Sequence, residues 1–259
     1  IENYSIIAET LAFSVTSVKP NSGGSGGYVS GTIRGAGFRP STRVFLSTGA
    51  DDVTEAQILE HVSSVEMKIR WHLAGVPLGT YDVTVRNTAS AVVMPGGFTV
   101  EPLREQAVII DNNSPRALLV NRKEQYALQF TNGSNVDMEY LFARIILPLG
   151  TEVEVVTSSS EFKTRRGMLP DSLIPESVAV KNYITTATGL FLPLVGRNLP
   201  PGEAFSCALT VRNTSLPGGS EFPLGVKARS MNKDYFLQDQ LSRIEELRGQ
   251  VLRSPTSYA

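Results

Sequence analysis

The first hundred residues contain several short segments in which apolar and polar residues alternate. Residues 12–18, 65–71 and 79–87 show this pattern most clearly. A period of two places successive side chains on opposite faces of a strand, so each segment is typical of a half-buried β-strand. Glycine and proline clusters, such as the one at 20–27, separate the segments. Short alternating strands between turn signals predict a β-sandwich over residues 10–101, preceded by an N-terminal extension at 1–9.

The alternation also predicts which side chains form the core of this sandwich. Eight apolar residues alternate with polar neighbours and are expected to face inward: Phe38, Val44, Leu46, Tyr81, Val83, Val85, Phe98 and Val100. Trp71 ends one of the predicted strands. Large aromatic side chains pack in cores more often than they form ligand platforms, so we favour core packing for Trp71 and retain it as a candidate interaction residue.

The order of local motifs in this module resembles the IPT/TIG domain. The motifs lie at 17–20 (Ser-Val-Lys-Pro), 23–27 (the glycine cluster), 32–38 (Thr-Ile-Arg-Gly-Ala-Gly-Phe), 44–46, 79–87 and 97–100. Together they cover essentially the whole module. The resemblance implies an immunoglobulin-like fold. It implies little about function, because the family occurs in bacterial surface proteins, animal receptors and transcription factors alike.

Residues 106–230 show a similar pattern and predict a second β-sandwich, joined to the first by a linker at 102–105. Residues 126–132 alternate and end in Thr-Asn, a polar loop follows at 133–137, and residues 141–148 end in Leu-Pro. This order resembles bacterial surface immunoglobulin-like domains of the CARDB or DUF11 type, over roughly a third of the module. The predicted fold class is therefore all-β, with two tandem immunoglobulin-like antiparallel β-sandwiches and a short C-terminal helix.

That helix is predicted within residues 231–259. Apolar residues recur there at steps of three and four, the period of an amphipathic helix: Leu237, Leu241, Ile244, Leu247 and Val251. Two alternatives remain open for it. It caps the second sandwich, or it begins a further domain. We slightly favour the second, because an apolar stripe needs a partner and both predicted sandwiches are complete without the helix.

Two features of the second module bear on chemistry. The first is the lone cysteine, Cys207, which shares one strand face with Phe205, Leu209 and Val211 and is expected to be a small buried hydrophobe. The second is a basic cluster of Lys163, Arg165 and Arg166 in a less regular stretch at 157–182. We favour a solvated loop for this cluster, since short charge runs usually face water. The alternative is a docking site for an acidic partner.

Composition narrows the function classes. The chain has 259 residues, 24 Lys and Arg, 25 Asp and Glu, and a formal net charge of −1. A net charge near zero produces no overall positive potential that would attract nucleic acid or anionic lipid. The sequence also has no stripe of basic residues of the kind that favours DNA binding. No run approaches the roughly 20 apolar residues that span a bilayer, so no membrane insertion is expected. Because the chain opens with Ile-Glu-Asn-Tyr rather than Met, we expect it to be a piece of a larger protein.

We find no sequence pattern that predicts catalysis or a cofactor. The two histidines, His61 and His72, lack metal-ligand spacing, and there is no nucleophile elbow, phosphate loop or zinc-protease motif. Asp51-Asp52 is expected to form an acidic turn, since a calcium site needs more oxygen ligands than the nearby Glu55 adds. No catalytic residue, cofactor or metal is therefore assigned.

The resulting hypothesis is a non-catalytic structural or interaction module of a large bacterial surface or secreted protein. Its partners would be other domains of the same protein or other surface proteins, with glycans as a further class. The alternative is a carbohydrate-binding accessory module of a secreted hydrolase or toxin. That function needs a row of exposed aromatic rings, and the single Trp and eight Tyr do not favour one. A hydrolase with an unrecognised site is the least favoured hypothesis.

Overall fold

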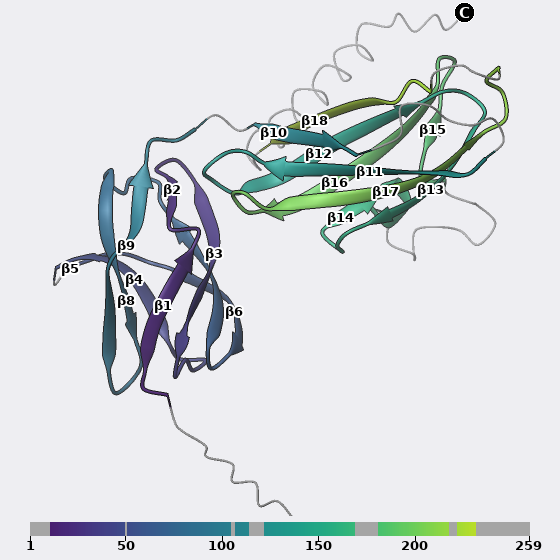
Figure 1. Ribbon diagram of the computed structural model, residues 1–259. Coiled ribbons are helices and arrows are strands. Elements are labelled where there is room, and N and C mark those ends of the chain that lie inside the picture. Colours follow the sequence, from purple (N-terminus) through teal and green to yellow (C-terminus); the bar gives the residue numbers. More distant parts are fainter. Residues whose placement is uncertain are drawn as a thin grey trace, which may run out of the picture. The chain divides into compact units, whose positions relative to one another are not determined.

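A computed structural model of the chain describes residues 11–49, 51–104, 107–113, 122–168, 181–217 and 222–231. The chain forms two compact units (Figure 1). Unit 1 consists of the described part of Ile1–Gln106 together with Ser134–Asp137 and Pro200–Gly202. Unit 2 consists of the remaining described residues. Two short later segments thus belong to unit 1, which is not one contiguous range. The domain boundaries expected from the sequence, with sandwiches at 10–101 and 106–230 and a linker at 102–105, stay a prediction.

Unit 1 is a sandwich of two sheets. One sheet has the strand order β1-β3-β7-β6, and its strands are β1 (Ser14–Lys19), β3 (Tyr28–Ala36), β7 (Glu66–His72) and β6 (Gln57–Ser63). The other has the order β2-β9-β8-β4-β5, and its strands are β2 (Ser22–Gly24), β9 (Ala91–Glu101), β8 (Gly79–Arg86), β4 (Arg43–Thr48) and β5 (Asp51–Glu55). All pairs are antiparallel except β2 with β9, which are parallel.

This strand order is that of an immunoglobulin sandwich. In an immunoglobulin domain the first, second, fifth and fourth strands (A, B, E and D) form one sheet, and the third, sixth and seventh (C, F and G) form the other. In unit 1, β1, β3, β7 and β6 take the first set of positions, and β4, β8 and β9 take the second. The β-sandwich expected from the alternation is thus present, and it has the immunoglobulin-like fold that the family resemblance implied.

The core of unit 1 contains all eight residues that the alternation predicted to face inward. Trp71 joins them, only 1% exposed, with its ring 5.8 Å from that of Phe98. His72, the next residue, is exposed on the opposite face of β7 and stacks on Tyr28. Neighbouring residues of one strand therefore face opposite ways, as the period-two pattern requires.

The Gly35-Ala36-Gly37 motif has a steric function. A side chain at Gly35 would collide with the carbonyl oxygen of Ser14 on the paired strand β1. Gly37 has a φ of 75°, in the left-handed region that glycine adopts without strain. The motif lets β1 approach β3 closely and then turns the chain.

Asp137 is a buried acid within unit 1. Its side chain is 3% exposed, and its two carboxylate oxygens accept hydrogen bonds from the backbone N–H and the hydroxyl of Ser30, both at 2.7 Å. Arg70 Nε lies 3.3 Å from the carboxylate and donates to the Ser30 hydroxyl at 3.0 Å. Val136 lies in the same hydrophobic core as Trp71. Residues far along the chain thus complete unit 1.

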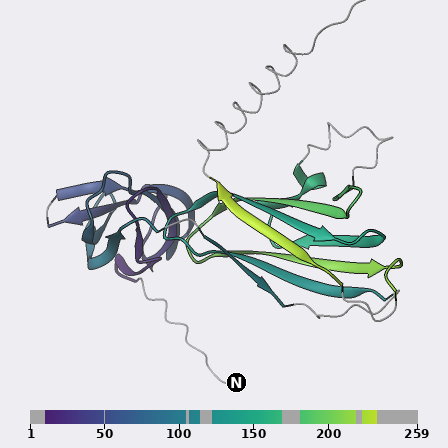
Figure 2. The same cartoon turned by 90° about the horizontal axis from the view of Figure 1, so that it is seen from above.

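Unit 2 is a second two-sheet sandwich, whose strands Figure 2 shows from another side. One sheet has the order β10-β11-β17-β13, and its strands are β10 (Val108–Asn112), β11 (Glu124–Asn132), β17 (Ala204–Asn213) and β13 (Thr151–Thr157). The other has the order β14-β16-β12-β18, with β15 paired to β16, and its strands are β14 (Phe162–Thr164), β16 (Leu190–Leu199), β12 (Met138–Leu147), β18 (Gly225–Met231) and β15 (Ile184–Thr185). A short helix, α1 (Arg165–Met168), follows β14.

The core of unit 2 confirms the predicted face of β17. Phe205, Cys207, Leu209 and Val211 are all buried, and they alternate with more exposed residues along the strand. The amphipathic helix predicted after Asp234 and the extension at 1–9 lie outside the described residues. Within the described ranges, no helix is long and apolar enough to cross a membrane.

We expect Asp137→Ala to lower the free energy of unfolding of unit 1 by about 3 kcal/mol, because Arg70 and the Ser30 N–H would lose a buried acceptor. Trp71 is the only tryptophan of the chain, so its fluorescence during urea unfolding reports on unit 1 alone.

Glu60→Ala is the matched control, since it removes an exposed pair with Lys68 from the same sheet and should cost less than about 1 kcal/mol. Equal effects of the two substitutions would contradict the importance of the buried network.

Candidate functional site

The three basic residues singled out in the sequence lie together on unit 2. Lys163 is the middle residue of β14, and Arg165 and Arg166 open α1. All three side chains are exposed. Trp71, the fourth candidate, is elsewhere: its ring is enclosed in the core of unit 1 and offers no face to a ligand. The stretch at 157–182, expected to be a solvated loop, contains strand and helix as well, since β14 and α1 lie within it.

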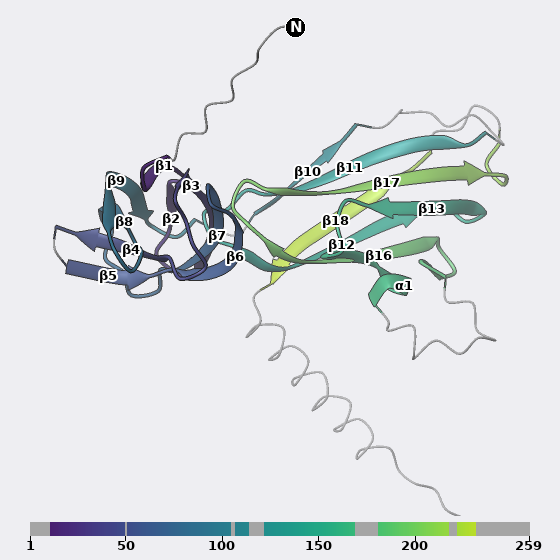
Figure 3. The same cartoon turned by 90° about the horizontal axis from the view of Figure 1, so that it is seen from below.

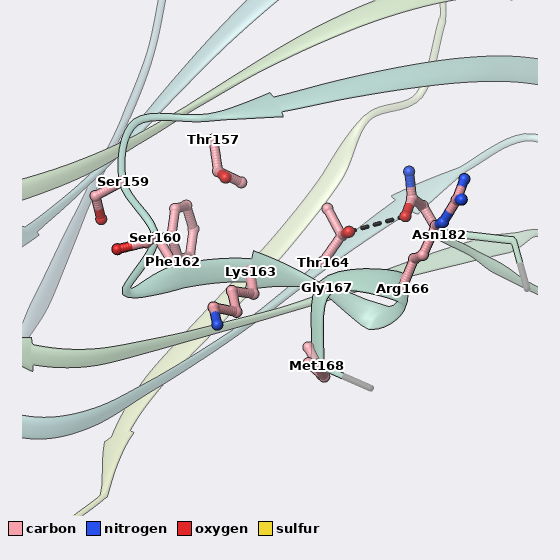
Figure 4. A pocket seen from close by; sticks show the side chains of 10 residues that line it. All are labelled: Thr157, Ser159, Ser160, Phe162, Lys163, Thr164, Arg166, Gly167, Met168 and Asn182. Carbon is pink, nitrogen blue, oxygen red and sulfur yellow. Dashed lines mark hydrogen bonds between the residues drawn. The ribbon is translucent and has the colours of Figure 1, made fainter. Parts of the chain in front are cut away.

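A pocket of about 670 Å³ opens beside β14 and α1 (Figure 4). Most of its lining is polar or basic, and the complete set of lining residues is Thr157, Ser159, Ser160, Phe162, Lys163, Thr164, Arg166, Gly167, Met168 and Asn182. Ser159 and Ser160 lie on the same side of the pocket as Lys163, and Asn182 lies beside Arg166 (Figure 4). The pocket therefore combines two cations with several neutral hydrogen-bonding groups.

Phe162 fixes the position of the strand that carries Lys163. Its side chain is fully buried, and its ring stacks on that of Phe205 at 5.0 Å and meets Phe130 edge-on at 5.7 Å. Because Phe162 faces the core, the next residue, Lys163, must face solvent. A cross-strand glycine makes room for this ring stack: Phe162 pairs with Gly196, and a Cβ at that position would lie 2.5 Å from the Phe205 ring.

Side-chain hydrogen bonds fix the opposite rim of the pocket. The Thr164 hydroxyl donates to Asn182 Oδ1 at 2.8 Å, a contact visible in Figure 4. Near the pocket, Glu161 pairs with Arg197 at 3.0 Å. The acid closest in sequence to Lys163 is thus already engaged by another cation.

Within the described ranges, the basic residues of the pocket lack acidic partners. Nine ion pairs are present in the described part of the chain, and none of them includes Lys163, Arg165 or Arg166. Some other exposed cations of this near-neutral chain are paired, as Arg43 is with Glu55. Unpaired charge beside hydroxyl and amide groups is suited to hold an anion or a carboxylate.

The sequence pointed to the cations of this pocket but missed its neutral lining. Thr157 is the last residue of β13, and Ser159 and Ser160 follow it in a stretch with the composition of an ordinary loop. Asn182 is distant in sequence and reaches the pocket only through the fold. No sequence signal distinguishes these residues from other surface hydroxyls and amides.

The acidic residues considered above as possible calcium ligands have a structural role. Asp51–Asp52, expected as a turn, instead begins strand β5, and Asp52 accepts a bond from Arg86 Nη2 at 2.8 Å. The strand forms because residues 51–55 pair with β4. No group of three or more His, Cys, Asp or Glu residues with the arrangement of a metal site occurs among the residues that the structure describes.

Comparisons with known proteins identify no family. No protein-family model matches the chain, and no curated protein matches its sequence. Among solved structures, the chain is similar to SGBP-B from a complex xyloglucan utilization locus in Bacteroides uniformis. The match has 10% sequence identity and a TM-score of 0.25, and it covers 86% of this chain and 74% of that chain. It is also similar to the collagen adhesin of S. aureus, with 9% sequence identity and a TM-score of 0.22. That match covers 86% of this chain and 99% of the adhesin chain. Likenesses this distant say nothing about ligands.

Cys207 is buried and is therefore poorly suited to act as a nucleophile. The thiol is 1% exposed, and desolvation raises its pKa to about 12. A thiol with this pKa is almost entirely protonated at neutral pH, and the thiolate is the reactive form.

We therefore expect Cys207 in the folded protein to react with a disulfide reagent at pH 8 at least about 100-fold more slowly than in urea. As the only cysteine, it reports on the folding of unit 2. Absorbance of the released thiolate measures the rate. Rapid labelling of the folded chain would contradict the buried position.

Proposed function

We propose that this chain is a non-catalytic interaction module of a larger bacterial surface or secreted protein and that its basic pocket docks an acidic partner. The observation that carries the proposal is the position of Lys163 and Arg166. Both line one pocket, and neither has an acidic partner among the described residues. An exposed cation with no partner is free to form a charge-assisted hydrogen bond with a carboxylate of another molecule.

The rigidity of the strand below the pocket supports this function. β14 is pinned by the stack of Phe162 on Phe205, so the backbone that carries Lys163 is ordered before a partner arrives. Preorganised groups lose less conformational freedom on binding, which leaves more of the interaction energy as affinity. The exposed side chain of Met168 adds apolar contact area at the rim.

The sequence resemblances extend the proposal. Unit 1 is proposed to be an IPT/TIG-like domain, on the motifs quoted above and on its immunoglobulin strand order. Unit 2 is proposed to be a CARDB- or DUF11-like surface domain. Both assignments favour a location outside the cell or on its surface. The partner would then be another domain of the same protein or a neighbouring surface protein.

A carbohydrate-binding accessory module is the second candidate. The observation that favours it is the neutral lining of the pocket, because Thr157, Ser159, Ser160 and Asn182 provide hydroxyl and amide groups that suit sugar hydroxyls. The enclosed ring of Trp71 counts against it, since the one tryptophan of the chain provides no stacking platform. Saturable binding of the chain to neutral glycans on an array would favour this candidate over the first.

For the first candidate, we expect Arg166→Gln and Lys163→Gln each to weaken binding of a fluorescein-labelled tetraglutamate peptide about fivefold or more, because each removes a charge-assisted contact. Fluorescence anisotropy of the full chain at low ionic strength measures the dissociation constant. Added salt should weaken binding further by screening exposed charges.

Lys123→Gln is the control, because this exposed lysine belongs to unit 2 and is already paired with Glu154. It should leave the dissociation constant unchanged. The proposed function fails if the unmodified chain does not bind the peptide, or if the control weakens binding as much as Arg166→Gln does.

A further inference from the structure

The charges of unit 2 are divided between its two sheets. The sheet that contains β12 and β18, together with α1, has one acid, Glu139, and seven basic residues: Arg144, Lys163, Arg165, Arg166, Arg197, Lys227 and Arg229. The opposite sheet has one basic residue, Arg212, and four acids: Asp111, Glu124, Glu152 and Glu154. A chain that is nearly neutral as a whole therefore presents one strongly basic sheet.

The strand register sets two like charges side by side. Arg144 of β12 is directly opposite Lys227 of β18, and Arg229 is two residues further along the same strand. Like charges directly opposite on neighbouring strands destabilise a sheet. Neither Arg144, Lys227 nor Arg229 forms an ion pair with any residue of the described ranges. Like charges placed together with no acid among the described residues to offset them are typical of a functional surface.

Aromatic rings hold two of these arginines against the sheet. The guanidinium of Arg144 lies over the Phe191 ring, 5.3 Å from its centroid, and that of Arg229 lies over the Phe142 ring at 6.0 Å. Cation–π contacts of this kind restrict the side chain and leave the guanidinium edge free to donate hydrogen bonds. Because an arginine covers each phenylalanine, these rings are poorly placed to stack on a sugar or a nucleobase.

The basic face is continuous with the pocket. Arg229 pairs across to Phe142, Phe142 to Val195, and Val195 to Lys163, which lines the pocket. The row crosses four neighbouring strands, a span of about 14 Å at the usual strand spacing. Figure 3 shows β18, β12 and β16 side by side, with α1 at the β16 edge. One extended ligand can therefore contact the pocket and the sheet face together.

We propose that the outer face of β12, β16 and β18 binds an extended acidic segment of a partner protein, one end of which occupies the basic pocket. The proposal rests on the proposed function of that pocket and specifies its ligand. Two forked guanidinium groups suit the side-chain carboxylates of Asp and Glu, which accept two parallel hydrogen bonds from one arginine. A longer acidic segment engages both surfaces, and a short one engages the pocket alone.

A second copy of unit 2 does not match the basic face as well. Its acidic sheet has the opposite charge, but Glu152 already pairs with Arg212 and Glu154 with Lys123. The remaining acids, Asp111 and Glu124, lie on the adjoining strands β10 and β11. The acidic groups of the ligand are therefore expected to come from another protein.

The test compares labelled tetraglutamate with labelled dodecaglutamate by fluorescence anisotropy, using the full chain. We expect the longer peptide to bind at least about tenfold more tightly. The double substitution Arg144→Gln with Arg229→Gln should remove most of that advantage and leave tetraglutamate binding unchanged. Arg144→Gln also relieves the repulsion with Lys227, so the thermal midpoint of unfolding should not fall. Arg212→Gln, on the opposite sheet, is the control and should leave both affinities unchanged.

The outcomes separate this proposal from the function of the pocket. Equal affinities for the two peptides, with no effect of the double substitution, would overturn the extended site and leave the pocket standing. The reverse result is also informative. If the double variant loses dodecaglutamate binding but Arg166→Gln does not change tetraglutamate binding, the sheet face is a binding site and the pocket is not. A higher affinity for oligogalacturonate or for single-stranded oligothymidylate than for dodecaglutamate would contradict the proposal that the partner is a protein. Binding that appears only after removal of residues 232–259 would show that the chain's own tail occupies the face.

Discussion

The proposed binding surface of unit 2 depends on the burial of one phenylalanine. Phe162 contacts Phe130 and Phe205 in the core and, together with the pairing of β14 with β16, holds β14 to the sandwich. Gly196, directly across on β16, leaves the space that the ring stack fills. Since successive side chains of a strand face opposite ways, burying Phe162 exposes Lys163 and sets the position of the helix that follows. The pocket and its charge both follow from this packing.

The two units use charge in different ways. In unit 1 the charged side chains of the sheets are mostly paired, as in Arg34 with Glu66, and the buried acid Asp137 is fully engaged by Ser30 and Arg70. In unit 2 the acidic sheet takes part in two ion pairs, Glu152 with Arg212 and Glu154 with Lys123. On the basic sheet Arg197 pairs with Glu161, and the other cations have no acidic partner among the described residues. Paired surface charges contribute little to stability and attract no partner. The unpaired ones raise the local potential and favour encounter with an anionic surface.

These features together support the proposed recognition function. The lone thiol is buried and protonated, and the cations are aligned along a sheet face with apolar rings beneath them. A sheet of this kind is a rigid platform on which spacing between charges is set by strand register. In the proposed interaction, this fixed spacing would match the spacing of carboxylates along the partner's acidic segment.

The sequence by itself determined the all-β fold and the identity of the core, because a half-buried strand imposes a period of two on its side chains. All eight predicted core residues of unit 1 and the inward face of β17 follow from that period alone. The sequence also located the cluster at Lys163, since neighbouring charges are visible in one dimension. Strand pairing decided the rest. Lys227 meets Arg144, and Asp137 reaches Ser30, only because hydrogen-bonded register and core packing join segments that are far apart in the chain. Alternation gives the direction in which each side chain points, but it does not say which strand lies beside which.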